Sequence, residues 1–243
     1  MPHYKTSIYS GDVLEIEEYF APRPAGKYIS RRNNENLTTA QQQEINRVQA
    51  QKKLSRLINC NFTKGDAFIT LTYAKIEDEE NSRKEMGKFL RRLRGYCRKN
   101  NLPELKYIAV TESEDARLHH HMVLTALPLD AIIDCWICGR VIASRLSPEG
   151  DYAGLARYIT KDSKKEGKRW SQSRNLKKPR VVRKEIKRAS GILKPPKGYR
   201  VIQQHFYVSD ATGKSQYLKA IKINGYDYAG ETPDAGRGGV KNE

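Results

Sequence analysis

The chain has 243 residues, enough for one buried core with appendages or at most two small domains. Its 45 Lys and Arg against 28 Asp and Glu give a formal net charge of +17 and a pI near 9.7, which points to a polyanionic partner. A membrane surface is disfavoured because there is no basic amphipathic helix rich in Leu and Trp, and the longest apolar run, around 131–138, is broken by Asp134. No signal peptide precedes the first residues, so we expect a cytoplasmic protein.

The first predicted elements are a strand and a helix. Residues 7–20 contain a turn and then an alternating apolar pattern, which predicts a strand, and the polar residues 22–37 predict a loop. A helix capped by Thr38 or Thr39 follows, with apolar residues near helical spacing and Lys and Arg elsewhere on its surface. This weakly amphipathic helix is a candidate to lie on nucleic acid.

A strand and an amphipathic helix come next. Residues 68–73 (Phe-Ile-Thr-Leu-Thr-Tyr) favour a strand with Phe68, Thr70 and Thr72 on one face. Residues 83–100 repeat apolar side chains at three- and four-residue steps, which predicts a helix with a buried apolar face and a basic outer face.

Three consecutive histidines stand in a predicted antiparallel hairpin formed by residues 105–112 and 117–124. Successive side chains of a strand alternate in direction, so His119 and His121 share one face and His120 takes the other. With the turn centred on residues 115–116, Glu112 lies directly across from His119. Two imidazoles and a carboxylate suit a divalent ion such as Mg²⁺ or Mn²⁺ at an open site. The alternative is that the histidines are ordinary surface residues.

Downstream, the sequence predicts a helix over 129–136, a strand over 139–146 and a helix over 152–162. Tyr158 and Lys161 are three residues apart in the last helix, which places an ammonium group near a phenol on one helix face. Tyr152 lies on a different face of this helix, and we interpret it as structural.

The most basic stretch of the chain is residues 163–200, with 15 Lys and Arg against Glu166 and Glu185. Trp170 stands among these cations, a mixture typical of a groove for single-stranded nucleic acid, whereas the alternative is a solvated basic linker. Residues 199–207 and 216–223 predict a terminal hairpin, and residues 229–243 predict a disordered tail.

Together these segments resemble the HUH endonucleases, specifically the rolling-circle replication initiators of the filamentous-phage gene-two and Gram-positive plasmid or phage type. The resemblance rests on the strand 68–73, the histidine motif 119–121 and the motif Tyr-Ile-Thr-Lys at 158–161, in the order of that family. Residues 169–179 also look like a segment common in these initiators. One departure is His120, because the middle position of the histidine motif is usually bulky and apolar.

The resemblance implies an α+β fold with a central antiparallel β-sheet flanked by helices, and a metal-dependent, sequence-specific endonuclease and strand transferase acting on single-stranded origin DNA in a bacterial host. In this reading Tyr158 is the nucleophile that forms a 5′-phosphotyrosine, Lys161 assists it, and the ligands of Mg²⁺ or Mn²⁺ are His119, His121 and Glu112. A host helicase and polymerase are expected partners, and a monomer is expected. The residues expected to contact DNA are Thr70, Thr72, Arg157, Arg169, Trp170, Arg174, Lys177, Lys178 and Arg180.

We divide the chain into an N-terminal strand and basic helix packing on the core (1–62), a catalytic core (63–165), a basic extension with a terminal hairpin (166–228) and the tail (229–243). Three alternatives to an initiator stay open: an HUH transposase or relaxase, a non-catalytic origin-binding protein, and an RNA-binding protein. Relaxases usually carry the tyrosine before the histidines, whereas Tyr158 follows them.

Overall fold

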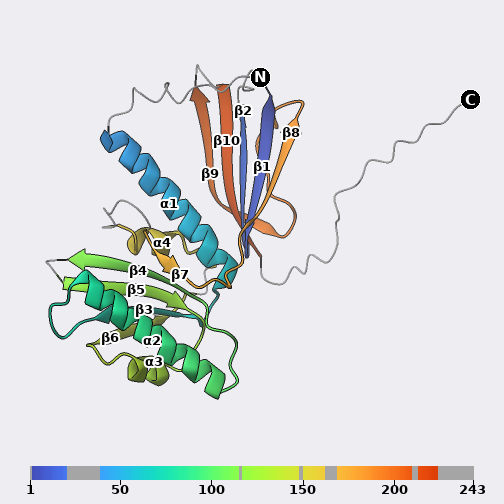
Figure 1. The fold of residues 1–243 in the computed structure, drawn as a ribbon. Coiled ribbons are helices and arrows are strands. Elements are labelled where there is room, and N and C mark those ends of the chain that lie inside the picture. The colour runs from blue at the N-terminus through green and yellow to red at the C-terminus, as the bar shows by residue number, and fades with distance from the viewer. Residues whose placement is uncertain are drawn as a thin grey trace, which may run out of the picture.

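The computed structural model describes residues 2–20, 39–114, 117–147, 150–161, 169–209 and 213–223. Within these ranges the chain forms two antiparallel five-stranded sheets and four helices, which confirms the predicted α+β class (Figure 1). The loop expected at 22–37 and the tail expected at 229–243 lie outside the described residues. In the described part of the chain, no helix is both long enough and apolar enough to cross a bilayer.

The first sheet, called the central sheet here, has the strand order β6-β3-β5-β4-β7. Its strands are β3 (Ala67–Thr72), β4 (Tyr107–Glu114), β5 (Arg117–Leu124), β6 (Val141–Arg145) and β7 (Ser171–Gln172). Strands β4 and β5 form the predicted hairpin, and their register pairs Glu112 with His119, as expected from a turn at 115–116.

One face of the central sheet is covered by α2 (Glu79–Lys99) and α3 (Leu129–Cys135) (Figure 1). Helix α2 is capped by Asp78, whose side chain accepts a hydrogen bond from the backbone N–H of Asn81. Its apolar stripe packs on side chains of β3 and β5 such as Leu71 and Met122. The predicted amphipathic helix at 83–100 is therefore confirmed, with its start four residues earlier.

The opposite face of the central sheet is covered by α1 (Thr39–Asn61) and the short α4 (Ala153–Tyr158). Leu54 and Ile58 of α1 and Ala156 of α4 belong to one apolar cluster with Ile108 and Val123 of the sheet. Phe68, Thr70, Glu112, His119 and His121 also lie on this face. They alternate along their strands with the residues that face α2.

The second sheet has the order β8-β1-β2-β10-β9 and joins the two ends of the chain. Its strands are β1 (His3–Ser10), β2 (Val13–Phe20), β8 (Arg180–Ile186), β9 (Tyr199–Ser209) and β10 (Gly213–Lys222). Gly11, at φ +60°, turns the chain between β1 and β2, where an added Cβ would stand 2.1 Å from the carbonyl oxygen of Asn59.

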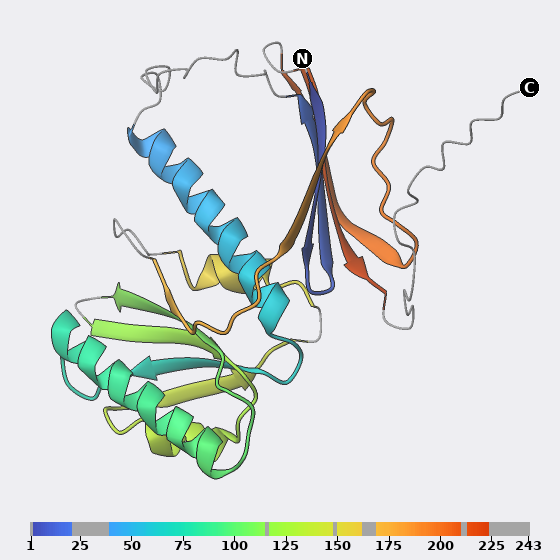
Figure 2. The ribbon, with the colours of Figure 1, turned by 45° about the vertical axis from the view of Figure 1, so that its right-hand side comes forward.

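Two ion pairs tie the second sheet to the helices on the central sheet. Arg56 of α1 donates two hydrogen bonds to the buried carboxylate of Glu15, and Lys219 of β10 donates two to Asp151, just before α4. Helix α1 thus connects the two sheets, as the two ribbon views show (Figures 1 and 2).

The second sheet contains elements that the sequence did not predict. Residues 7–20 were expected to hold a turn and one strand, whereas β1 precedes that turn and pairs with β2 along its whole length. Strand β8 lies in the stretch predicted only as basic, and it pairs with β1. Strands from the segments 1–62 and 166–228 therefore pair in one sheet. The division of the chain into domains at these boundaries stays a prediction.

Candidate active site

The polar pair His121 and Glu112 lies on the face of the central sheet that α1 and α4 cover. His121 Nε2 lies 2.8 Å from Glu112 Oε2, and His121 Nδ1 lies 3.0 Å from the hydroxyl of Thr70. Both members of the pair are buried. A hydrogen bond on each ring nitrogen fixes the orientation of the imidazole, so the ring is held by strands on both sides of β5.

The hydrogen bond of Glu112 runs along a diagonal of the hairpin. In register, Glu112 stands opposite His119, yet its carboxylate contacts His121, two residues farther along β5. Diagonal neighbours of an antiparallel pair are within reach of long side chains. The structure therefore brings Glu112 and His121 together and leaves His119 beside them on the same face.

The predicted metal ligands do not meet around one point. Among the residues that the structure describes, no three His, Cys, Asp or Glu side chains are arranged to hold a metal ion. Two of the three predicted ligands, His121 and Glu112, are in direct contact with each other instead.

The donor set still fits a divalent ion in its chemistry. Glu112 Oε1 is buried without a hydrogen-bond partner, and an unpartnered buried carboxylate oxygen costs free energy unless a cation or proton satisfies it. In the tautomer that carries the proton on Nδ1, that N–H donates to Thr70, and Nε2 would serve as a ligand once an ion replaces its hydrogen bond to Glu112. The residues that could hold the ion are Glu112, His121 and His119.

His120 points to the other face of the sheet, as the strand alternation predicts. It is 2% exposed, and its ring nitrogens lie within 3.1 Å of the hydroxyls of Tyr73, Ser82 and Thr111. Burial lowers the pKa of His120 to about 4, so the ring is neutral at pH 7. The histidine therefore takes a place in the core beneath α2, where the family pattern has an apolar residue.

Tyr158 stands over His121 at the end of α4. Its ring meets the imidazole edge to face with centroids 5.5 Å apart, and it contacts Phe68 in the same way at 6.2 Å. The side chain is 50% exposed, so a ligand from solvent can reach it. Lys161 Nζ lies 5.7 Å from the centroid of the Tyr158 ring, in line with the predicted proximity. The helix is shorter than the predicted 152–162, because it ends at Tyr158 and continues as a turn.

Tyr152 is buried, which agrees with its interpretation as a structural residue. It is buried in the apolar cluster under α1, and its hydroxyl donates to the carbonyl oxygen of Ser147. Burial also raises its pKa. Of the two tyrosines in this segment, Tyr158 is the accessible one.

The predicted DNA-contacting residues fall into two groups. Thr70 is bonded to His121, Thr72 donates to the carbonyl oxygen of Arg140, and Arg157 is exposed beside Tyr158, so these three border the site. The others lie on the segment 169–180, where the side chains of Arg174, Lys177, Lys178 and Arg180 are exposed. Arg180 also places its guanidinium 4.1 Å from the centroid of the Tyr9 ring.

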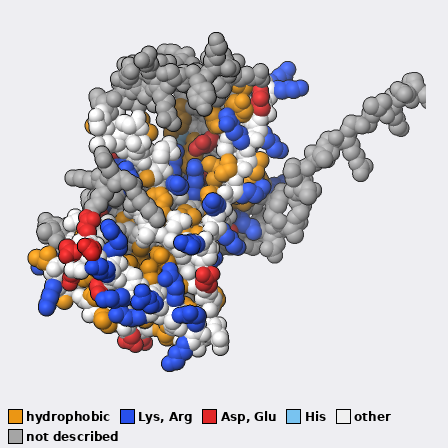
Figure 3. Space-filling view, viewed as in Figure 1, with side chains coloured by type: hydrophobic (Ala, Val, Ile, Leu, Met, Phe, Trp, Pro, Cys, Tyr) orange, Lys and Arg blue, Asp and Glu red, His pale blue; other side chains and the backbone are white. Residues whose placement is uncertain are grey.

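A basic cleft of about 900 Å³ lies between α1 and this segment. Trp170 is half-buried there, with Lys53 of α1 and Arg169 and Lys178 of the segment around it. In the space-filling view, Lys and Arg side chains spread over much of the face shown, including α2 (Figure 3). The sequence suggested that α1 contacts nucleic acid, but not that it forms one wall of the Trp170 cleft, because that packing is made between residues more than 100 positions apart.

The strand β3, the histidine hairpin and α4 all lie within one stretch of the chain that is similar to a known family. Residues 66–167 match the family of Replication-associated protein ORF2/G2P. This match confirms the resemblance to replication initiators of the gene-two type and supports a replication-associated role. The strands of the second sheet and the residues that line the basic cleft lie outside the matched range. No curated protein and no solved structure gives a match.

Proposed function

We propose that this replication-associated protein initiates rolling-circle replication by nicking single-stranded origin DNA and later rejoining the ends. The observation that carries the proposal is the accessible Tyr158 ring packed edge to face on His121, which is itself paired with Glu112. A nucleophile, an imidazole and a carboxylate thus lie together within the range matched by a replication-associated family.

Tyr158 attacks the scissile phosphorus atom. The phenol oxygen gives up its proton and forms a bond to phosphorus, the bond from phosphorus to the 3′-oxygen breaks, and that oxygen takes up a proton, so the products are a 5′-phosphotyrosine and a free 3′-hydroxyl. A phenol with an ordinary pKa of about 10 is a weak nucleophile at neutral pH, so it needs a nearby positive charge. The ammonium group of Lys161 beside the ring stabilises the negative charge of the transition state.

Glu112 and His121, with His119 from the same face, would hold a divalent ion such as Mg²⁺ or Mn²⁺. The ion supplies Lewis-acid neutralisation of the non-bridging phosphate oxygens when it is bound. Thr70 keeps the His121 ring in the orientation this requires, through its hydrogen bond to Nδ1.

The phosphotyrosine conserves the energy of the broken phosphodiester bond, so attack by a 3′-hydroxyl reverses the reaction and circularises the strand. Nicking and joining need no ATP in this scheme. Unwinding and synthesis are assigned to a host helicase and polymerase. The basic segment 169–180 and the Trp170 cleft hold the single strand through phosphate contacts and base stacking.

The test is a covalent trap. The protein is incubated with Mn²⁺ and a library of single-stranded oligonucleotides, and species that stay attached in denaturing electrophoresis are scored. Wild type is expected to form an adduct, and Tyr158→Phe is expected to lose it while keeping its DNA affinity. Tyr96→Phe serves as the control because Tyr96 lies on α2, on the other face of the sheet. An adduct retained by Tyr158→Phe, or no adduct with wild type, contradicts the proposal.

A further inference from the structure

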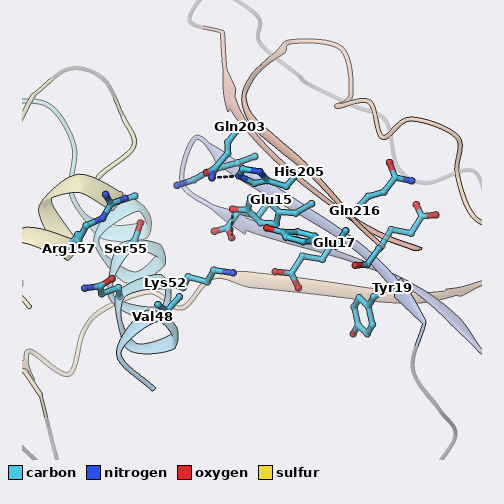
Figure 4. A pocket seen from close by; sticks show the side chains of 17 residues that line it. Glu15, Glu17, Tyr19, Val48, Lys52, Ser55, Arg157, Gln203, His205 and Gln216 are labelled. Carbon is cyan, nitrogen blue, oxygen red and sulfur yellow. Dashed lines mark hydrogen bonds between the residues drawn. The ribbon is translucent and has the colours of Figure 1, made fainter. Parts of the chain in front are cut away.

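A second cleft, of about 510 Å³, lies between the second sheet and the helices α1 and α4 (Figure 4). Strands β2, β9 and β10 form one wall, Val48, Lys52 and Ser55 of α1 form the other, and Arg157 of α4 stands at one end. Arg157 directly precedes Tyr158, so helix α4 borders both this cleft and the site at His121.

Aromatic rings line the sheet wall. His205 stacks on Tyr217 with centroids 6.2 Å apart and an angle of 21° between the ring planes, and Tyr207 packs beside His205 at 6.0 Å. Tyr207 is 56% exposed, and His205 is also exposed. Exposed, ordered rings of this kind are the platforms on which unpaired bases stack.

The charge of this cleft differs from that of the rest of the protein. Its lining contains Glu15, Glu17 and Glu18 against Lys52, Arg157 and Lys219, so it is balanced in a protein of net charge +17. Arg56 pairs with Glu15 at 2.7 Å and lies 3.8 Å from Glu17, and Lys219 pairs with Asp151. A cleft with carboxylates repels a phosphate backbone, but a carboxylate accepts hydrogen bonds from the amino groups of bases.

Side-chain amides add further base-reading groups. Gln51 Nε2 is buried at the cleft without a hydrogen-bond partner, and Gln203 contacts His205 at 2.7 Å along the sheet wall. Donors, acceptors and stacking surfaces are thus combined in one place. The basic cleft at Trp170, in contrast, has no carboxylate among the described residues that line it.

We propose that this cleft binds the unpaired bases that flank the scissile phosphate and determines which sequence is cleaved, with His205 and Tyr207 stacking on bases and Glu17 reading an amino group. This inference rests on the proposed nicking function and assigns its sequence specificity. The basic segment 169–180 then supplies affinity for any single strand, and the cleft supplies the preference among sequences.

The first experiment compares sequence preferences in the covalent trap, using the same oligonucleotide library with wild type, Glu17→Gln and the double variant His205→Ala/Tyr207→Ala. We expect the preference at one or more flanking positions to fall by about tenfold, as for the loss of one good base contact, at an unchanged salt dependence. Lys178→Ala, in the basic cleft, is the matched control and should lower binding of all sequences alike. Adducts that form with the wild-type preference in both cleft variants overturn the inference while the nicking function stands.

The second experiment does not require cleavage. In full-length Tyr158→Phe protein, acylation of His205 by diethyl pyrocarbonate is mapped with and without the oligonucleotide selected above or, if none is selected, the whole library. Protection of His205 by the single strand is expected. If a Lys-rich peptide protects His205 and the oligonucleotide does not, the cleft is a site for a basic peptide and the inference is wrong, whatever the result of the covalent trap.

Discussion

The three adjacent histidines occupy three different environments because a strand turns each side chain to the opposite face from its neighbour. His121 is buried between Thr70 and Glu112, His119 lies on the same face beside them, and His120 is buried among hydroxyls under α2. Only His119 and His121 are therefore on the side of Tyr158. We therefore propose the metal-binding role for these two histidines and a structural role for His120.

The burial of His120 predicts how stability depends on pH. Its pKa is lowered to about 4 in the folded state. Between pH 6.5 and 4, His120 is therefore protonated in the unfolded chain but neutral in the folded chain, so the free energy of unfolding falls as the pH falls. Acidification through this window should cost on the order of 3 kcal/mol of unfolding free energy. Urea unfolding of wild type and His120→Gln at pH 7 and pH 4.5 measures this, and the variant should lose less on acidification. Equal losses would show that His120 does not titrate as described.

The pair of Glu112 and His121 predicts a metal effect that can be seen without DNA. A divalent ion bound only by the folded protein raises the melting temperature, because binding to the native state adds stability. Mn²⁺ should therefore raise the Tm of wild type, and His121→Ala should abolish this rise and abolish cleavage while leaving DNA binding largely intact. His205→Ala, at a histidine in the other sheet, is the control for the rise in Tm alone and should keep it. A rise in Tm that persists in His121→Ala would remove that residue from the ligand set.

Much of this geometry could be predicted from the sequence, because it depends on local rules. A turn predicted at 115–116 gives the register that β4 and β5 have in the structure, and the alternation of β3 places Phe68 and Thr70 on the site face. The diagonal contact of Glu112 with His121 could not be predicted, because it depends on the rotamer that neighbouring strands and α4 allow. The ring contact between Tyr158 and His121 could not be predicted from a sequence pattern either, because it joins segments that are far apart in the chain.

At the scale of elements, α1 is the connection between the two sheets. Its apolar face packs on the central sheet through Leu54 and Ile58, while Arg56, on another side, holds Glu15 of the second sheet. Glu15 is buried, and the hydroxyl of Tyr217 also donates to it. The position of the second sheet against α4 therefore depends partly on one buried ion pair.

Breaking that pair from one side should be costly. Arg56→Leu leaves a buried carboxylate with no cation, and we expect a loss of about 3 kcal/mol in the free energy of unfolding, whereas Arg56→Leu/Glu15→Leu should recover most of it. Denaturant unfolding of the two variants gives both values. Lys84→Ala, which breaks the exposed pair with Glu80, is the control and should cost less than about 1 kcal/mol. If the single and double variants are equally destabilised, Arg56 does not stabilise the buried charge of Glu15.

The elements that the sequence predicted well are those with a strong internal period. Helix α2 and strand β3 carry unambiguous apolar spacing, so they were located to within a few residues. Strand β8 was missed because its residues are basic and exposed, and its partner β1 is about 175 positions away, so nothing local marks it. The second sheet as a whole arises from such long-range pairing between the chain ends.

At the scale of the whole molecule, we expect the positive charge to be divided between a DNA-binding surface and a solvated surface. Lys177 and Lys178 lie exposed next to the Trp170 cleft, whereas Lys84 and Lys88 lie on α2 and pair with Glu80 and Glu85. The net charge of the protein does not show which of these lysines contact DNA. The effect of neutralising each pair on DNA affinity does show it.

Neutralising Lys177 and Lys178 should weaken binding to all single strands and lower the slope of log K against log salt by about 1.4, at about 0.7 per phosphate contact. Arg180 is left in place because its guanidinium lies over the ring of Tyr9. The matched variant Lys84→Ser/Lys88→Ser removes the same charge from α2 and should leave the slope unchanged. Affinity titrations of both variants at several salt concentrations decide this, and equal slopes would exclude the segment from the interface.

The most direct test of the account is to identify the atom to which DNA becomes attached. The wild-type protein is incubated with Mn²⁺ and single-stranded oligonucleotides, digested, and the peptide that carries nucleotide mass is sequenced by mass spectrometry. The account predicts a 5′-phosphate ester on the Tyr158 oxygen, formed with Mn²⁺ and absent after chelation. Attachment at any other residue, or no attachment while the protein still binds single strands, would contradict it.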